Sequence, residues 1–196
     1  MVVAQKPKTR FSAAEYLALE EEAEYRSEYY QGEIFAMSGG SANHNRIAGN
    51  LFVALRSALR GKPCEAFIND MRLQVKRHHL YTYPDVMVVC GKIEFAQGRN
   101  DTIANPILIV EVLSPSTEAY DRGKKFEFYR SIEGFQEYVL VDQQRMHIER
   151  YRPLGLGRWE MTTLDATDEI LSLTSVGIDL TLASIYERVD LESELT

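Results

Sequence analysis

The stretch PILIVEVLSPS, residues 106–116, carries one carboxylate inside a run of large apolar side chains. Four aliphatic residues precede Glu111, and Val112 and Leu113 follow it. An apolar run of this length is typical of a strand that is buried on both faces of a sheet. Because an isolated carboxylate is costly to bury, we expect Glu111 to be paired, to be protonated or to bind a ligand.

A second apolar run, YPDVMVVC at residues 83–90, also begins with a carboxylate. Side chains alternate along a strand, so Asp85 shares a face with Met87 and Val89. If the two strands are neighbours, Asp85 and Glu111 meet at one edge of the sheet, where one is protonated or a divalent cation holds both. Such oxygen ligands favour Mg²⁺ or Mn²⁺. The alternative is that each acid accepts hydrogen bonds in a turn or forms a surface salt bridge.

A helix predicted at residues 120–132 directs one lysine toward the sheet. At helical spacing, one face of this helix is formed by Lys125, Phe128, Tyr129 and Ile132. Lys124 falls on the side of Glu127 and is expected to face solvent. Lys125 either reaches the surface and pairs with Asp121, or lies beside the two carboxylates. An ammonium in the second position can orient an attacking water and stabilise charge on a phosphate.

Two further residues carry a weaker signal. His44 lies one turn into a helix predicted at residues 42–60, in line with Ile47, and a histidine there more often belongs to the core than to a catalytic site. Glu33 follows a hairpin glycine and shares a strand face with Phe35. Most acids in such a position are surface groups, so both residues are secondary candidates.

The other patterns predict an α/β fold of the mixed α+β kind, with helices flanking a central mixed sheet. Ser12 and Glu15 have the spacing of a capping box at the start of the first helix, and a hairpin is expected around Gln31 and Gly32. Further strands are predicted at 64–77, 83–90, 106–113, 136–142, 146–151 and 158–164, and a last helix at 180–188. We expect a single domain over 1–196, with its core at about 10–188.

The chain has 196 residues and a net charge of −7, with 29 acidic and 22 basic residues. This balance argues against a passive nucleic-acid coat, whose affinity comes from neutralising phosphates. It allows an enzyme that meets a polyanion through a metal ion and a local basic patch. Two such patches occur, VKRHHLY at 75–81 and DRGKKFEFYR at 121–130.

The two cysteines, Cys64 and Cys90, are isolated and have no metal-ligand spacing around them. We therefore expect neither a disulfide framework nor a structural zinc site, as is usual in a reducing compartment. Residues 1–10 lack the apolar core of a signal peptide, and no apolar stretch approaches a membrane span. The expected location is the cytoplasm, with no membrane partner.

Several segments together resemble a known protein family. They are SEYYQGEIFAMSGGSANHNRIAGNL at 27–51, YPDVMVVC at 83–90, PILIVEVLSPSTEAYDRGKKFEFYR at 106–130 and GFQEYVLVD at 134–142. Over about residues 10–180 the chain is similar to the Uma-type restriction-endonuclease family, a branch of the PD-(D/E)XK nuclease superfamily. The resemblance implies a restriction-endonuclease-like core and metal-dependent cleavage of DNA.

The resemblance also implies a set of site residues. Asp85 matches the acid of the P-D element, and Glu111 matches the acid of the (D/E)-x-K element. Leu113 stands where the superfamily usually has its lysine, and the position that matches the lysine of the Uma-type branch is Lys125. Asp85 and Glu111, with the backbone carbonyl of Val112, would hold Mg²⁺ or Mn²⁺. Glu28, Glu33 and His44 also match recurrent family positions, and His44 or Glu33 would support the water or the outer shell.

The first hypothesis is therefore a magnesium-dependent endonuclease that acts on DNA. A second is a catalytically inactive nuclease-fold module for binding or assembly, which the net negative charge and Leu113 favour. A third keeps the metal chemistry but has RNA or a smaller phosphodiester as substrate. A homodimer with two-fold symmetry fits the first hypothesis, because cutting both strands of a duplex needs two sites.

Overall fold

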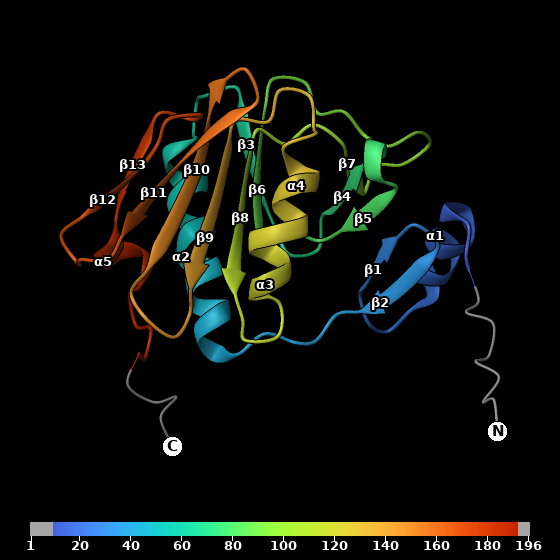
Figure 1. Ribbon diagram of the computed structural model, residues 1–196, viewed down its shortest axis with the longest axis horizontal. Coiled ribbons are helices and arrows are strands. Elements are labelled where there is room, and N and C mark those ends of the chain that lie inside the picture. The colour runs from blue at the N-terminus through green and yellow to red at the C-terminus, as the bar shows by residue number, and fades with distance from the viewer. Residues whose placement is uncertain (1–9, 192–196) are drawn as a thin grey trace.

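The computed structural model describes residues 10–191 (Figure 1). The helical elements are α1 (Ala13–Glu22), α2 (Ala42–Ala58), η1 (Lys76–His78), α3 (Glu118–Tyr120), η2 (Asp121–Lys125), α4 (Phe126–Tyr129) and α5 (Leu182–Ile185). The strands are β1 (Ser27–Tyr30), β2 (Glu33–Ala36), β3 (Cys64–Ile68), β4 (Arg72–Val75), β5 (Leu80–Thr82), β6 (Val86–Cys90), β7 (Thr102–Ile103), β8 (Leu108–Leu113), β9 (Glu137–Asp142), β10 (Ile148–Gly155), β11 (Arg158–Leu164), β12 (Ile170–Leu173) and β13 (Ile178–Thr181).

A six-stranded sheet with the order β11-β10-β9-β8-β6-β3 forms the centre of the fold. Strands β8 and β9 are parallel and the other neighbours are antiparallel, so the predicted mixed sheet is confirmed. Helix α2 covers one face, and the segment α3-η2-α4 covers the other (Figure 1). Ile109 and Leu113 of β8 pack in one cluster with Phe128 and Tyr129, so the face that carries Glu111 lies under the second helical layer.

A second sheet, of five strands in the order β2-β1-β5-β4-β7, lies beside the first (Figure 1). Helix α1 packs on it through Tyr16, whose ring centroid lies 5.1 Å from that of Tyr29. The predicted capping box of Ser12 and Glu15 is present. The β1–β2 turn is also confirmed, with Gln31 at φ 46° and Gly32 at φ 94°. Positive φ at both central residues suits a tight hairpin turn.

The prediction of one long strand at 64–77 is wrong, because a turn at Asn69 divides it into two strands. This residue adopts φ 49°, a left-handed conformation that asparagine tolerates better than most side chains. Strand β4 follows the break and joins the second sheet by pairing with β5, a strand that the sequence patterns did not reveal. The β12–β13 hairpin was also missed, and α5 is shorter than the helix expected at 180–188.

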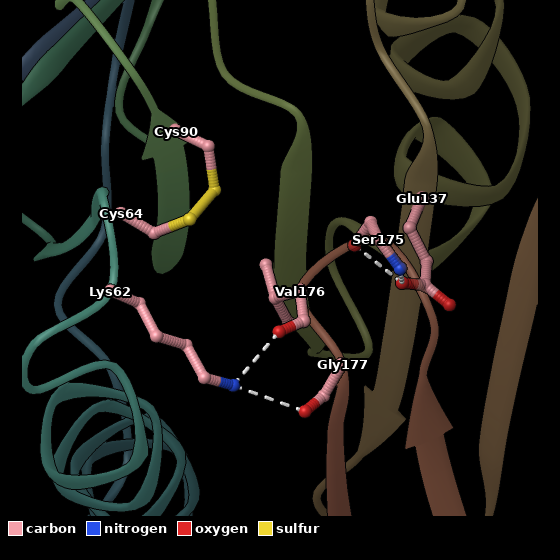
Figure 2. The surroundings of a disulfide bond; sticks show 7 residues. All are labelled: Lys62, Cys64, Cys90, Glu137, Ser175, Val176 and Gly177. Carbon is pink, nitrogen blue, oxygen red and sulfur yellow. Dashed lines mark hydrogen bonds between the residues drawn. A yellow bond between two sulfur atoms is a disulfide. The ribbon is translucent and has the colours of Figure 1, made fainter.

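The expectation that the cysteines stay unpaired is wrong as well. Antiparallel pairing of β3 with β6 places Cys64 directly opposite Cys90, with their Cα atoms 3.9 Å apart, and the two sulfurs form a disulfide. Figure 2 shows this bond beside the Lys62 side chain, whose ammonium donates to the carbonyls of Val176 and Gly177. Strand register brings together two cysteines that are 26 residues apart in sequence.

Within the described part of the chain, no helix has the length and apolar character that crossing a membrane requires. Residues 1–9, on which the absence of a leader was predicted, lie outside the described range. The cytoplasmic location stays a prediction.

Candidate active site

The register of β6 and β8 brings Asp85 and Glu111 together. Val86 pairs with Val110, so the next pair along the antiparallel ladder would be Asp85 and Glu111. The Asp85 backbone N–H donates to Glu111 Oε2 at 3.3 Å, and the Val112 N–H donates to Asp85 Oδ2 at 2.8 Å. Side-chain oxygens thus continue the ladder beyond its last backbone pair, and the two carboxylates meet where the paired part of β6 and β8 ends.

Glu111 is buried, with 3% of its surface exposed. Its Oε1 accepts hydrogen bonds from the Tyr129 hydroxyl at 2.7 Å and from Lys125 Nζ at 3.2 Å. Burial raises the pKa of Glu111 to about 8, an effect that the charge of Lys125 opposes and the neighbouring Asp85 and Asp121 reinforce. In the absence of a further cation, these surroundings therefore favour the protonated form of this carboxyl more than water does.

Lys125 points into the same space from η2. Its Nζ lies 3.2 Å from Glu111 Oε1, 3.2 Å from Asp121 Oδ1 and 3.3 Å from Glu28 Oε1. Burial lowers the pKa of Lys125, but the surrounding acids outweigh this and raise it well above its usual value. The lysine pairs with Asp121, as the simpler interpretation of the sequence proposed, and contacts the strand carboxylate as well.

Lys124, which precedes Lys125 in the sequence, is exposed and lies over the ring of Tyr30, with Nζ 5.9 Å from the ring centroid. The helical spacing therefore selected the correct lysine for the buried position. Residues Asp121–Lys125, however, form a π-helical turn rather than the predicted α-helix. Single π turns of this kind are frequent at functional sites. Here the wider turn buries Asp121 and Lys125 side by side, and the Tyr138 hydroxyl donates to the Asp121 carbonyl at 3.1 Å.

Negative charge exceeds positive charge in this space. We define the charged cluster as Asp85, Glu111, Asp121, Glu28, Lys125 and His44. Four carboxylates thus face one ammonium and one imidazole. Asp121 Oδ1 is buried and, among the described residues, has no hydrogen-bond partner of good geometry, although Lys125 Nζ is near. Such a surplus of buried acid favours either protonation or an additional cation.

His44 approaches the cluster from the first turn of α2. Its Nε2 lies 3.2 Å from Asp85 Oδ2, and 18% of its side chain is exposed. Burial lowers the pKa of His44, but the hydrogen bond and charge of Asp85 outweigh this effect and raise it. Gly40 leaves room for the ring, since a Cβ at Gly40 would lie 2.8 Å from His44 Nδ1.

A buried amide fixes the start of α2 against the end of β8. The Ser41 hydroxyl accepts from the His44 N–H at 3.1 Å and donates to the side-chain carbonyl of Gln143. Gln143 Nε2 in turn donates to the Leu113 carbonyl at 2.8 Å. Gln143 therefore holds His44 and the acidic strand in one arrangement. Sequence reasoning missed it, because Gln143 sits at a strand end far along the chain and carries no local signal.

The two hairpin acids differ in their contacts. Glu28 reaches Lys125 and accepts from the Thr82 hydroxyl at 2.5 Å. Glu33 of β2 pairs with Tyr30, which lies on the same hairpin face as Glu28 but two residues farther along β1. Glu28, which the sequence patterns ranked below Glu33, is thus the hairpin carboxylate in contact with the lysine, and a role for Glu33 stays a prediction.

The donor set is compatible with a hard divalent cation at one specific place. Among the described residues, no three or more His, Cys, Asp and Glu side chains are grouped as ligands. Asp85 and Glu111 supply two carboxylates, and the Val112 carbonyl points to the same side of β8 as its N–H, which bonds Asp85. Mg²⁺ is commonly held by one or two carboxylates and completes its shell with water.

Comparison with known proteins gives a consistent result. Residues 13–183 match the model of the Uma2 family, described as "Putative restriction endonuclease". The uncharacterized protein sll1609 of Synechocystis sp. is 43% identical over 153 residues, which cover 78% of this chain and 86% of that protein. The uncharacterized protein slr1290 of the same organism is 39% identical over 182 residues, or 92% and 93% of the two chains.

A solved structure shows the same fold. The crystal structure of a "putative nuclease belonging to DUF820" from Anabaena variabilis superimposes with a TM-score of 0.72. The match covers 88% of this chain and 96% of that chain, at 22% sequence identity. The mixed sheet flanked by helices is therefore the restriction-endonuclease-like arrangement that the sequence resemblance predicted.

Proposed function

The chain belongs to the Uma2 family, and from this premise we propose that it is a divalent-metal-dependent endonuclease that hydrolyses phosphodiester bonds in DNA. The observation that carries the proposal is the convergence of Asp85, Glu111 and Lys125 in a buried, acid-rich space. A purely structural core would not gather unbalanced charge in this way, because burying it is costly.

Asp85, Glu111 and the Val112 carbonyl would hold the cation. When bound there, it would supply positive charge that polarises the phosphate and favours ionisation of an attacking water. Ionising Glu111 is then linked to metal binding, because its raised pKa keeps a proton on the metal-free carboxyl. Tyr129, whose hydroxyl donates to Glu111, fixes the orientation of that carboxylate.

Lys125 and His44 would act on the substrate side. Lys125 presents a permanent positive charge 3.2 Å from Glu111, where it can orient the nucleophile and stabilise charge on the phosphate. The lysine comes from η2 rather than from the residue two after Glu111, where Leu113 packs in the core. His44 bonds Asp85 and holds it in place, and its imidazole can exchange a proton with the reacting groups.

Plasmid cleavage in magnesium tests the proposal, with the neighbouring lysine as a matched control. Lys125→Met should lower the cleavage rate by at least about a hundredfold, as removal of one transition-state contact does. Lys124→Met should leave the rate at saturating DNA unchanged, because that side chain is exposed and lies outside the charged cluster. Asp85→Asn should be as inactive as Lys125→Met, and thermal melting should show all three variants folded.

Failure of the unmodified protein to cut DNA in magnesium or manganese would contradict the proposal. Equal cleavage by the unmodified protein and by Lys125→Met would do so as well. Cleavage of RNA but not of DNA would support the proposed hydrolysis of phosphodiester bonds and contradict DNA as the substrate.

A further inference from the structure

A pocket of about 310 Å³ opens directly beside the charged cluster. Its wall includes Asp85 and His44, so any group that occupies it lies next to the proposed reaction centre. The remaining wall comes from the α1–β1 connection, which carries Tyr25, from the β2–α2 connection at 37–40, and from Asn45, Asn69 and Tyr83. Tyr25, Asn45 and Asn69 have no part in the proposed chemistry.

The charge of this pocket does not suit a second phosphate. Glu24 and Asp85 line it together with the cations Arg26 and His44. Arg26 is already engaged, because its guanidinium lies 5.5 Å from the centroid of the Tyr83 ring and its Nε lies 3.5 Å from Asp70 Oδ1. The pocket therefore has no surplus positive charge to offer an anion.

Its neutral groups suit a flat molecule that forms hydrogen bonds. Tyr25 is 74% exposed, an unusual position for a large aromatic ring. Asn45 Nδ2 donates to the Ser41 carbonyl at 3.0 Å, and no described residue donates to its Oδ1. No described residue hydrogen-bonds the side-chain amide of Asn69. Aromatic rings and free amides are the groups with which proteins bind splayed nucleobases.

We propose that this pocket binds one unpaired nucleobase next to the phosphate that is cut, which makes nucleic acid with an unpaired nucleotide the favoured substrate class. The inference rests on the proposed function and makes it more specific. A base in a regular duplex is paired and stacked, and it must leave the helix before it can enter a side pocket. A mismatched or single-stranded base enters at lower cost.

Binding measurements test the pocket without depending on cleavage. Fluorescence anisotropy is recorded with a perfect duplex, the same duplex with one central mismatch, and the corresponding single strand, with calcium in place of magnesium. The unmodified protein should bind the mismatched and single-stranded oligonucleotides roughly tenfold more tightly than the duplex, as one base stacked on an aromatic ring implies. Electrophoresis of the same samples shows whether any strand has been cut.

Three variants locate the effect. Tyr25→Ala should remove the preference for unpaired nucleotides and bind all oligonucleotides like the duplex, whereas Tyr25→Phe should keep it, because the ring is retained. Phe95→Ala is the control, since Phe95 is also exposed, at 40%, and does not line the pocket. A preference that survives Tyr25→Ala, or equal affinity of the unmodified protein for all oligonucleotides, would overturn the inference even if plasmid is cleaved. A preference that depends on Tyr25 in a protein that cuts nothing would uphold the pocket and contradict the nuclease.

Discussion

Glu111 and Glu137 are buried glutamates on neighbouring parallel strands, and the structure surrounds them in opposite ways. Glu137 is fully buried and accepts hydrogen bonds from the Ser175 N–H at 3.1 Å, the Ser175 hydroxyl at 2.6 Å and the Thr174 N–H at 3.3 Å. Figure 2 shows Glu137 facing Ser175. Glu111 shares one lysine with two other acids.

The difference fits a structural role for Glu137 and the metal-binding role proposed for Glu111. The loop before β13 supplies Glu137 with three neutral donors, and Arg150 Nε lies 3.9 Å from its Oε1, so this carboxylate has hydrogen bonds and a cation beside it. Glu111 lies among like charges, and its pKa is raised because burial outweighs the attraction of Lys125. Burial of an acid alone is thus uninformative, whereas burial beside further acids that compete for one cation is what a metal site would require.

The largest effect expected from this comparison follows the loss of Lys125. In the metal-free protein, Lys125→Met leaves several buried carboxylates without their cation, which should lower the free energy of unfolding by about 3–5 kcal/mol. Lys124→Met, at an exposed position, should change it by less than about 0.5 kcal/mol. Urea unfolding measures both values, and equal losses for the two variants would show that the buried ammonium does not balance the cluster.

The same substitution should change the free energy of unfolding by unequal amounts at the two glutamates. Glu137→Gln turns an amide N–H₂ toward donors that need an acceptor, and should cost about 1–3 kcal/mol. Glu111→Gln also turns an N–H₂ toward a donor, but it removes a carboxyl whose ionisation the fold disfavours, so its cost in the metal-free protein at pH 8 should be clearly smaller. Urea unfolding of both variants at this pH is the measurement. Destabilisation of similar size at both positions would remove the distinction between them.

The pH dependence of stability should come from Glu111. Its pKa is about 8 in the folded protein, whereas in the unfolded chain it has the ordinary value of 4.5. Between these two pH values the folded state therefore binds more protons than the unfolded state. The contribution of protonated Glu111 to the free energy of unfolding is therefore complete below about pH 4.5 and is lost as the pH rises to about 8. One proton gives a slope of about 1.4 kcal/mol per pH unit.

Glu111→Gln should remove most of this slope, and Glu137→Gln should retain it. A smaller slope of the same sign should remain, because the pKa of His44 is also raised. Stability that rises with pH across this window in the metal-free protein would contradict the assignment.

The smallest effect concerns the geometry of His44. A Cβ at Gly40 would meet the His44 ring, so Gly40→Ala should displace the imidazole from Asp85 and slow cleavage by about tenfold, equal to about 1.4 kcal/mol. Gly39→Ala is the matched control, since no atom lies within 4 Å of a Cβ built there. The pH profile of the cleavage rate should change only in Gly40→Ala. Identical profiles for both variants would show that the His44–Asp85 contact does not matter.

The parts of this structure that follow local rules were predictable from sequence. Ser12 and Glu15 form their capping box, and the Gln31-Gly32 turn joins β1 to β2 as expected. Strand alternation and helical spacing placed Glu111 and Lys125 on facing surfaces, because each pattern depends only on residues near in sequence.

The parts that depend on register and tertiary packing were not predictable. The disulfide of Cys64 and Cys90 exists because β3 pairs with β6 in one register. The π turn at Asp121–Lys125 adds one residue to a helical turn, and the nearest sequence signal is the flexible Gly123 inside it. Contact of Glu28 with Lys125 requires the hairpin to pack against η2, which no local pattern encodes.

The most direct test of the account is a calorimetric titration with Mg²⁺ and Mn²⁺ above pH 8, where Glu111 has lost its proton. We predict that the unmodified protein and Glu137→Gln bind one ion per chain, and that Asp85→Asn and Glu111→Gln bind none at that site. Equal binding by Glu111→Gln and the unmodified protein, or no binding of either metal by the unmodified protein, would contradict the proposed metal site.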